Sequence, residues 1–288
     1  MEDEKINQPM TELAGEAAKA ERAGGLLESR DYYKPFQYPW AYEAFMQSEQ
    51  MHWLWTEVPM LEDVKDYQQK LTDSERDFLT KILRFFTQGD IDVSGAYVNS
   101  YLPRFKQPEV RMMLSSFAAR EAVHIAAYSH LIETLGLPES IYNEFLQYEA
   151  MAAKHDFFNE VCRDKGDLAA QIAAFSAFTE GMQLFSSFVM LLNFTRCGTM
   201  KGMGQIIAWS IADETLHTES MTKIFREYIT ENPELWTDEL KAKIYGIAEV
   251  MVDLEDKFID LAFGVSEMKR LTREVRQIRF HGLMQCWA

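Results

Sequence analysis

The same arrangement of acidic and histidine residues occurs twice in this chain. In each copy a single carboxylate is followed, 31 or 34 residues later, by a Glu-x-x-His tetrapeptide. The six residues are Asp90, Glu121, His124, Glu180, Glu214 and His217. One acid on a helix and Glu-x-x-His on the next helix, repeated once, is typical of a dinuclear metal site inside a four-helix bundle. We therefore expect an all-α protein built around such a bundle.

The apolar periodicity around Asp90 places this carboxylate on a buried helix face. A capping box begins at Thr72, and apolar residues then recur mostly at steps of three and four from Leu79 to Tyr97. An unpaired buried charge is unfavourable, so an inward carboxylate needs a partner such as a metal ion. The other expected helices cover residues 41–54, 108–136, a segment after Pro138, a segment from Asp167 to Gly198, a segment after a connection at 202–204, and residues 238–263 and 265–284.

Spacing within each Glu-x-x-His explains how a metal could be held. Residues i and i+3 share a helix face, so each pair can bind one ion, and the two single acids can be terminal or bridging ligands. Four carboxylates and two imidazoles suit iron or manganese better than zinc, because the set is rich in oxygen and lacks thiolate. A third match, Glu49 to His52, lacks a partner acid helix and is interpreted as coincidence.

Composition excludes several classes of protein. The net charge of −16 argues against nucleic-acid and anionic-membrane partners. We see no apolar run of the ~18 residues that a membrane span needs, and the N-terminus lacks the basic-then-apolar order of a secretory signal. Cys162, Cys197 and Cys286 have no metal-binding spacing, which favours reduced thiols in the cytoplasm. We expect residues 1–30 to form a flexible arm and 31–288 a single domain.

From about residue 39 to 280 the chain resembles the small, radical-generating beta subunit of class I ribonucleotide reductase, which has a ferritin-like fold. The segments that resemble this family are Phe85-Phe86-x-x-x-Asp90, Glu121-Ala-Val-His124-x-x-x-Tyr128, Glu180-Gly-x-x-x-x-Ser-Ser-Phe188, Asp213-Glu214-Thr-Leu-His217, and His52-Trp53-Leu54 followed by Glu57-Val58-Pro59. The fold expected from the resemblance is a ferritin-like four-helix bundle with additional helices.

The resemblance also implies an activity. The six residues would bind a dinuclear iron or manganese centre that oxidises Tyr128 to a radical. A separate large catalytic subunit would use this radical to reduce ribonucleotides to deoxyribonucleotides. Trp53, Asp213 and His124 match the family's relay between the metal site and the surface, and Leu184 and Phe188 would wall a dry pocket around Tyr128. A homodimer, a cytoplasmic location and, in some relatives, a flavoprotein activator are further implications.

Two features depart from the family. Its members usually end in a flexible tail with a relay tyrosine, whereas no tyrosine follows Tyr245 here, so such a tail is either missing from this chain or replaced by another coupling. Ser210 and Ala212 stand where many relatives have bulkier residues. Two alternatives remain: another ferritin-like dimetal oxidase or oxygenase, which would need a substrate cavity at the metals, and a metal-storage bundle.

Overall fold

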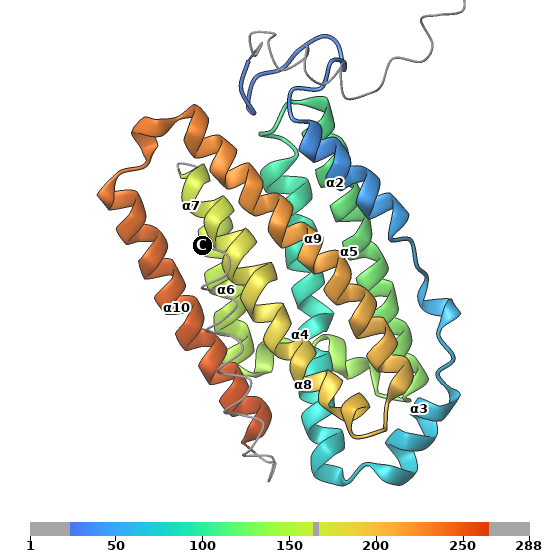
Figure 1. The fold of residues 1–288 in the computed structure, drawn as a ribbon. Helices are drawn as coiled ribbons and strands as arrows, with labels where there is room; N and C mark the ends of the chain where they lie inside the picture. The colour runs from blue at the N-terminus through green and yellow to red at the C-terminus, as the bar shows by residue number, and fades with distance from the viewer. Residues whose placement is uncertain (1–23, 164–166, 265–288) are drawn as a thin grey trace, which may run out of the picture.

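The computed structural model describes residues 24–163 and 167–264, and within these ranges it contains helices and no strands (Figure 1). The bundle helices are α4 (Asp73–Ala96), α5 (Pro108–Thr134), a continuous helix made of α7 (Leu168–Ala173), η6 (Ala174–Gln183) and α8 (Leu184–Arg196), and α9 (Lys201–Glu231). The other helices of eight or more residues are α2 (Pro39–Gln50), α6 (Glu149–Arg163) and α10 (Asp238–Phe263).

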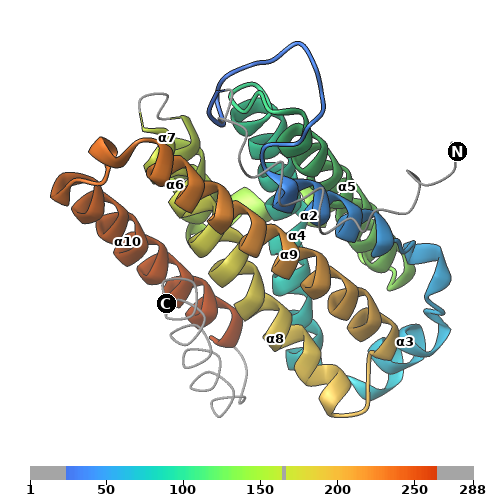
Figure 2. The same cartoon turned by 45° about the horizontal axis from the view of Figure 1, so that its top comes forward.

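The four bundle helices form a closed ring around one core. Helix α4 packs against α5, α5 against α9, α9 against the α7–η6–α8 helix, and α8 back against α4. Helix α2 lies over α5 and α9, while α6 and α10 cover the opposite side of the ring (Figures 1 and 2). The prediction of an all-α, ferritin-like four-helix bundle with additional helices is thus confirmed.

Local sequence signals begin and end these helices. The predicted capping box is formed, since Thr72 accepts a hydrogen bond from the backbone N–H of Glu75 and the Glu75 side chain accepts one from Thr72 N–H. Pro108 occupies the first turn of α5, where a missing N–H is harmless. Gly136 and Gly198 end helices with φ of +74° and +88°, a region that favours glycine.

Two predicted boundaries were wrong, and both corrections concern the site. Helix α2 ends at Gln50 rather than near residue 54, so Trp53 lies in an irregular connection before a short turn at Trp55–Glu57. Residues 202–204 are not a connection but belong to α9. The carboxylate of Asp63, from α3 (Leu61–Lys65), accepts the N–H groups of Gly202 and Met203 and so caps this helix from outside the local sequence.

Other expectations are met in part or not tested. Two short turns, Glu139–Tyr142 and Phe145–Gln147, come between Pro138 and α6. The helix expected over 265–284 lies outside the described residues, as do residues 1–23 of the expected arm. The rest of that arm, residues 24–30, packs on the bundle, where Leu26 is buried and Arg30 forms an ion pair with Glu109.

One helix among the described residues, Leu168–Arg196, is long and apolar enough to cross a membrane by length and average composition. It is not an uninterrupted apolar run, since Gln171, Glu180 and Gln183 fall within it. In the fold most of this helix is buried inside the protein, because both α9 and α10 cover it. Packing in the bundle accounts for its apolar composition.

Candidate metal centre

The structure brings the six predicted ligand residues together in the centre of the bundle. Asp90 comes from α4, the first Glu-x-x-His pair from α5, Glu180 from η6 and the second pair from α9. Each side chain is at most 1% exposed. Their oxygen and nitrogen atoms form two groups in which all atoms lie within 4.8 Å of one another, and the groups share Glu121. Such a cluster, which four separate helices assemble, is suited to cations rather than to core packing.

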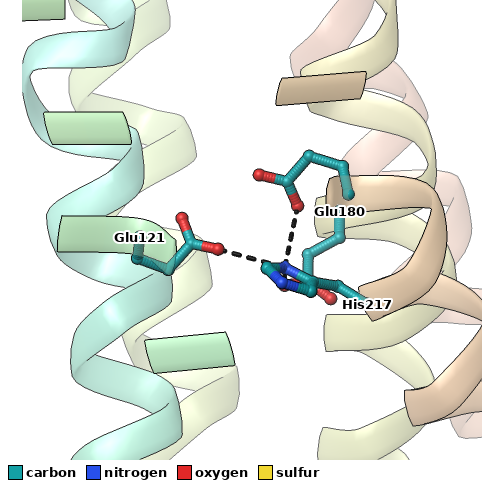
Figure 3. A group of neighbouring side chains, drawn as sticks. Glu121, Glu180 and His217 are labelled. Atoms are coloured by element: carbon teal, nitrogen blue, oxygen red, sulfur yellow. Dashed lines mark ion pairs between the residues drawn. The ribbon is translucent and has the colours of Figure 1, made fainter. Parts of the chain in front are cut away.

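Within this cluster two glutamates lie between the two histidines. Glu121 places Oε2 3.4 Å from His124 Nδ1 and Oε1 3.1 Å from His217 Nδ1. Glu214 does the same from the opposite side, with Oε1 3.2 Å from His124 Nδ1 and Oε2 3.4 Å from His217 Nδ1. Figure 3 shows Glu121 and Glu180 approaching His217 from different helices. This geometry favours Glu121 and Glu214 as the bridging acids.

The two single acids lie at the two ends of the cluster. Asp90 groups with Glu121 and His124, and Glu180 groups with His217, whose Nδ1 is 3.6 Å from Glu180 Oε1. Of the two roles considered from the sequence, the structure therefore favours the terminal one for both acids. The hydroxyl of Tyr97 donates a hydrogen bond of 2.7 Å to Glu180 Oε1, a contact that spacing along the chain did not predict.

Unpartnered atoms within the cluster support the presence of metal. Buried polar atoms in proteins almost always have hydrogen-bond partners, so each exception needs an explanation. Here eight buried atoms of this cluster have none: Asp90 Oδ2, both Oε atoms of Glu121 and of Glu214, Glu180 Oε2, and both ring nitrogens of His217. The carboxylate–imidazole pairs of the cluster lie 3.1–3.6 Å apart, as ion pairs that a shared cation could replace. The donor set fits two divalent ions of the iron or manganese type.

The pKa values of the clustered residues also support cation binding. Burial raises the pKa of Asp90 well above its usual value and that of Glu180 to about 8. Burial also disfavours charged histidine, yet the neighbouring carboxylates prevail and raise the pKa values of His124 and His217. The cluster thus holds extra protons, which cations would displace on binding.

A second layer of contacts connects the cluster with Trp53. Asp213 Oδ2 accepts a 2.9 Å hydrogen bond from the indole Nε1 of Trp53 and lies 3.0 Å from His124 Nε2. An ionised carboxylate can only accept, so His124 carries a proton on Nε2 and directs Nδ1 toward the glutamates. Burial opposes the charge on Asp213, but these two hydrogen bonds lower its pKa. The three predicted relay residues are therefore in direct contact.

Sequence reasoning missed Arg120 in this layer. Its Nε lies 3.5 Å from Asp213 Oδ2 and its guanidinium lies over the Trp53 ring, 5.5 Å from the centroid. The arginine directly precedes the first Glu-x-x-His, and a basic residue on the buried side of α5 was the only available signal. Trp55, considered as a competitor of Trp53, is half-buried and packs against the same core cluster to which the buried Trp53 belongs.

The predicted radical residue, Tyr128, lies in the same bundle core. Its ring is 2% exposed and stacks on Phe86 with ring centroids 4.6 Å apart, and Phe86 stacks in turn on Phe188. The hydroxyl donates a 3.1 Å hydrogen bond to Ser210 Oγ. Leu184 belongs to the same buried cluster. The surroundings are thus apolar on the ring faces, with one polar partner that sequence reasoning had noted only as a small residue.

The third Glu-x-x-His is not part of any metal-ligand cluster in the described residues. Glu49 accepts a hydrogen bond from Ser116, and His52 is exposed beyond the end of α2. Its interpretation as coincidence agrees with this placement.

The comparisons with known proteins agree on one family. Residues 30–278 match the family described as ribonucleotide reductase, small chain. A probable ribonucleoside-diphosphate reductase small subunit of Invertebrate iridescent virus 6 is 52% identical over 257 residues, which cover 83% of this chain and 71% of the relative. The beta subunit of the Chlamydia pneumoniae enzyme is 30% identical over 239 residues, covering 78% of this chain and 69% of the relative.

Solved structures show the same fold. The ribonucleotide reductase R2 subunit of Clostridium botulinum has a TM-score of 0.81 at 20% identity and covers 92% of this chain and 89% of its own. Streptococcus sanguinis dimanganese(II)-NrdF has a TM-score of 0.79 at 19% identity, covering 89% and 92%. Together with the assembled carboxylate–histidine cluster, these matches show that the chain belongs to the small-subunit family of ribonucleotide reductase.

Proposed function

We propose that this chain generates and holds the radical of a ribonucleotide reductase, with Tyr128 as the radical residue. The observation that supports this most is the placement of a buried, ring-stacked tyrosine one helical turn after the ligand His124, on the same face of α5. The radical would serve a separate large catalytic subunit, where ribonucleotides lose the 2′-hydroxyl. Membership in the family already implies such a partner.

The six clustered residues would hold two ions, iron or manganese. The histidines would each bind one ion through Nδ1, the atom that faces the carboxylates, with Glu121 and Glu214 shared between them. When bound, the pair of ions would supply the oxidising equivalent that the side chains lack. Affinity order alone does not select between the two metals in such a site.

The protein would control the proton and the surroundings of Tyr128. Burial, reinforced by Asp90, raises the pKa of this phenol, so the phenolate is strongly disfavoured. Removal of an electron makes the neutral phenol strongly acidic, so its proton would be lost with the electron, and Ser210 Oγ is the atom that accepts the hydrogen bond of this hydroxyl. The ring of Phe86, which Phe188 backs by stacking on it, would keep water and reductants away from the face of Tyr128 that it covers.

We further propose the route and setting of the radical. Trp53, Asp213 and His124 would pass the oxidising equivalent outward, since they form an unbroken series of contacts from the cluster. The described domain would act as a cytoplasmic homodimer in deoxyribonucleotide synthesis for DNA replication, with a flavoprotein activator as a further candidate partner. Residues 1–30 would include a flexible arm, of which 24–30 pack on the single metal-binding domain formed from the rest of the chain.

The stacked rings around Tyr128 favour the radical role over the oxygenase alternative, which would need a substrate cavity at the metals. A cavity of about 30 Å³ lies near the segments that carry Asp90 and Glu180, lined in part by Gly89, Thr179 and Leu184. This volume admits a water molecule, whereas sites for organic ligands usually need several hundred Å³.

Electron paramagnetic resonance on the metal-loaded protein tests the proposal. We expect a dinuclear metal stoichiometry and, after oxidative activation, an organic radical signal that Tyr128→Phe abolishes without changing the metal content. Tyr101→Phe is the matched control, because Tyr101 is equally buried but bonds to the Gln171 carbonyl, away from the cluster. A signal that survives in Tyr128→Phe would remove this residue from its proposed role.

A further inference from the structure

A second tryptophan lies directly against the outermost member of the proposed relay. The ring of Trp209, from α9, has its centroid 5.3 Å from that of Trp53. Among the described residues, the aromatic rings in contact with Trp53 belong to His124, on the side of the cluster, and to Trp209. Trp53 itself is 4% exposed, whereas Trp209 is half-buried. On the side away from His124, the aromatic neighbour of Trp53 among the described residues is therefore the more exposed ring of Trp209.

The charged groups near the Trp53 ring differ from those near the Trp209 ring. The buried guanidinium of Arg120 lies 5.5 Å over the ring of Trp53, and its side chain is 9% exposed, so water screens it poorly. A cation over an indole face is attracted to the neutral ring but repels a ring that has lost an electron. No cation is recorded over Trp209 among the described residues. Asp213 is hydrogen-bonded to the Trp53 indole and paired with Arg120, and it offsets this repulsion. The difference that favours oxidation of Trp209 is therefore its half-buried ring, which water can solvate once it is oxidised.

We propose that Trp209 is a redox-active residue that donates an electron to oxidised Trp53 and so connects the buried relay with the surface. This inference rests on the proposed radical function. In the step, Trp209 loses one electron and the oxidised Trp53 ring gains it, so no bond forms or breaks at Trp53, whose Nε1–H keeps its hydrogen bond to Asp213. The oxidised Trp209 releases its indole proton to water, and it later regains an electron from a one-electron donor at the surface and a proton from water.

The experiment follows the decay of the Tyr128 radical signal after addition of hydroxymethylferrocene, a one-electron reductant too bulky for the packed core. In the unmodified protein the electron enters through Trp209 and Trp53, and the signal decays. We expect Trp209→Phe to slow this decay several-fold, nearly to the rate of Trp53→Phe. Trp55→Phe is the matched control, because Trp55 is also half-buried and packs on the same core cluster as Trp209.

The outcomes separate this inference from the proposed function. A normal radical that decays in Trp209→Phe at the unmodified rate, while Trp53→Phe is slow, overturns the role of Trp209 alone. Absence of a tyrosyl signal in the unmodified protein overturns the proposed function and this inference with it. Equal slowing in Trp55→Phe would also count against Trp209, because it would indicate a general change in the packing of the core.

A second measurement does not depend on a substitution at Trp209. Repeated activation in air without the large subunit leaves an indole radical at the end of the route, and dissolved dioxygen adds to this radical to give an oxygenated indole. Mass spectrometry of the digested protein should find this modification at Trp209 and not at Trp55, and Trp53→Phe should reduce it several-fold. Equal modification of Trp209 and Trp55 would overturn the proposal.

Discussion

The hydroxyl of Tyr128 donates a hydrogen bond to Ser210 inside a cluster of aromatic rings, and this single contact decides how the phenol is kept in place. Ser210 is fully buried. Ser210→Ala should destabilise the protein by about 1–3 kcal/mol, because the buried phenol loses its acceptor. In the Tyr128→Phe background, Ser210→Ala should destabilise the protein less, and the coupling free energy between the two substitutions should be about 0.5–1.5 kcal/mol. Denaturant unfolding of the four proteins measures this cycle, and simple additivity would contradict the contact.

Asp213 contacts both His124 and Trp53, so it connects the proposed metal site with the proposed relay. Asp213→Asn should lower manganese affinity roughly 10–100-fold, because the neutral amide no longer orients the imidazole or strengthens it as a ligand. Titration of the metal-free protein with manganese measures this. Asp92→Asn is the control, because Asp92 pairs with His155 at 2.6 Å outside the cluster. Equal losses in both variants would show a general effect of removing buried charge.

At the scale of helices, the buried ion pair between Lys154 and Glu255 connects α6 with α10. Lys154 Nζ lies 2.6 Å from Glu255 Oε2, both side chains are at most 2% exposed, and Ser186 also donates to the same carboxylate. Lys154→Met should destabilise the protein by about 3–5 kcal/mol, because it leaves a buried charge without its partner. Lys154→Met combined with Glu255→Met should recover most of this loss.

Denaturant unfolding compares these variants with Lys257→Met on α10, the helix that carries Glu255. This substitution removes a solvent-exposed ion pair with Asp253 and should have little effect on the free energy of unfolding. If the single Lys154 substitution were as mild as the exposed one, the pair would not hold the two helices together.

The helices and the ligands could be predicted from the sequence because both follow regular periodicity. The capping box at Thr72 and the steps of three and four around Asp90 depend only on neighbours along one helix. The cap of α9 by Asp63 could not be predicted, because it joins residues about 140 positions apart. The same holds for Arg120 over Trp53, which requires knowing how the connection after α2 lies on the bundle.

The helix that carries Glu180 shows a subtler limit. Residues 174–183 form a π-helix, so the register of side chains changes just before and at this ligand. A pattern based on 3.6 residues per turn still places Glu180 on the inward face, but it cannot say which way the carboxylate points or that Tyr97 will donate to it. Wider turns of this kind often occur at functional sites in helices.

For the whole molecule, protons and metal ions compete for the same buried groups, which makes stability depend on pH. In the metal-free protein burial raises the pKa of Glu180 to about 8, and the neighbouring carboxylates raise those of His124 and His217 despite burial. A raised pKa in the folded state gives stability below the unfolded pKa, which is lost as pH rises through the folded value. Glu214 has the opposite effect, because its pKa is lowered to about 2: its contribution to stability is lost as the pH falls toward that value.

The free energy of unfolding of the chelated protein should therefore fall by at least about 1 kcal/mol between about pH 5.5 and pH 8. In the metal-loaded protein the cations replace these protons, so the loss should be smaller, and the stabilisation by metal should grow with pH. Glu180→Gln should flatten the curve of the chelated protein, whereas Glu219→Gln, which removes an exposed charge from α9, should not. This pair of variants separates the buried cluster from the general self-repulsion of a chain with a net charge of −16, and equal slopes in both would assign the effect to the surface.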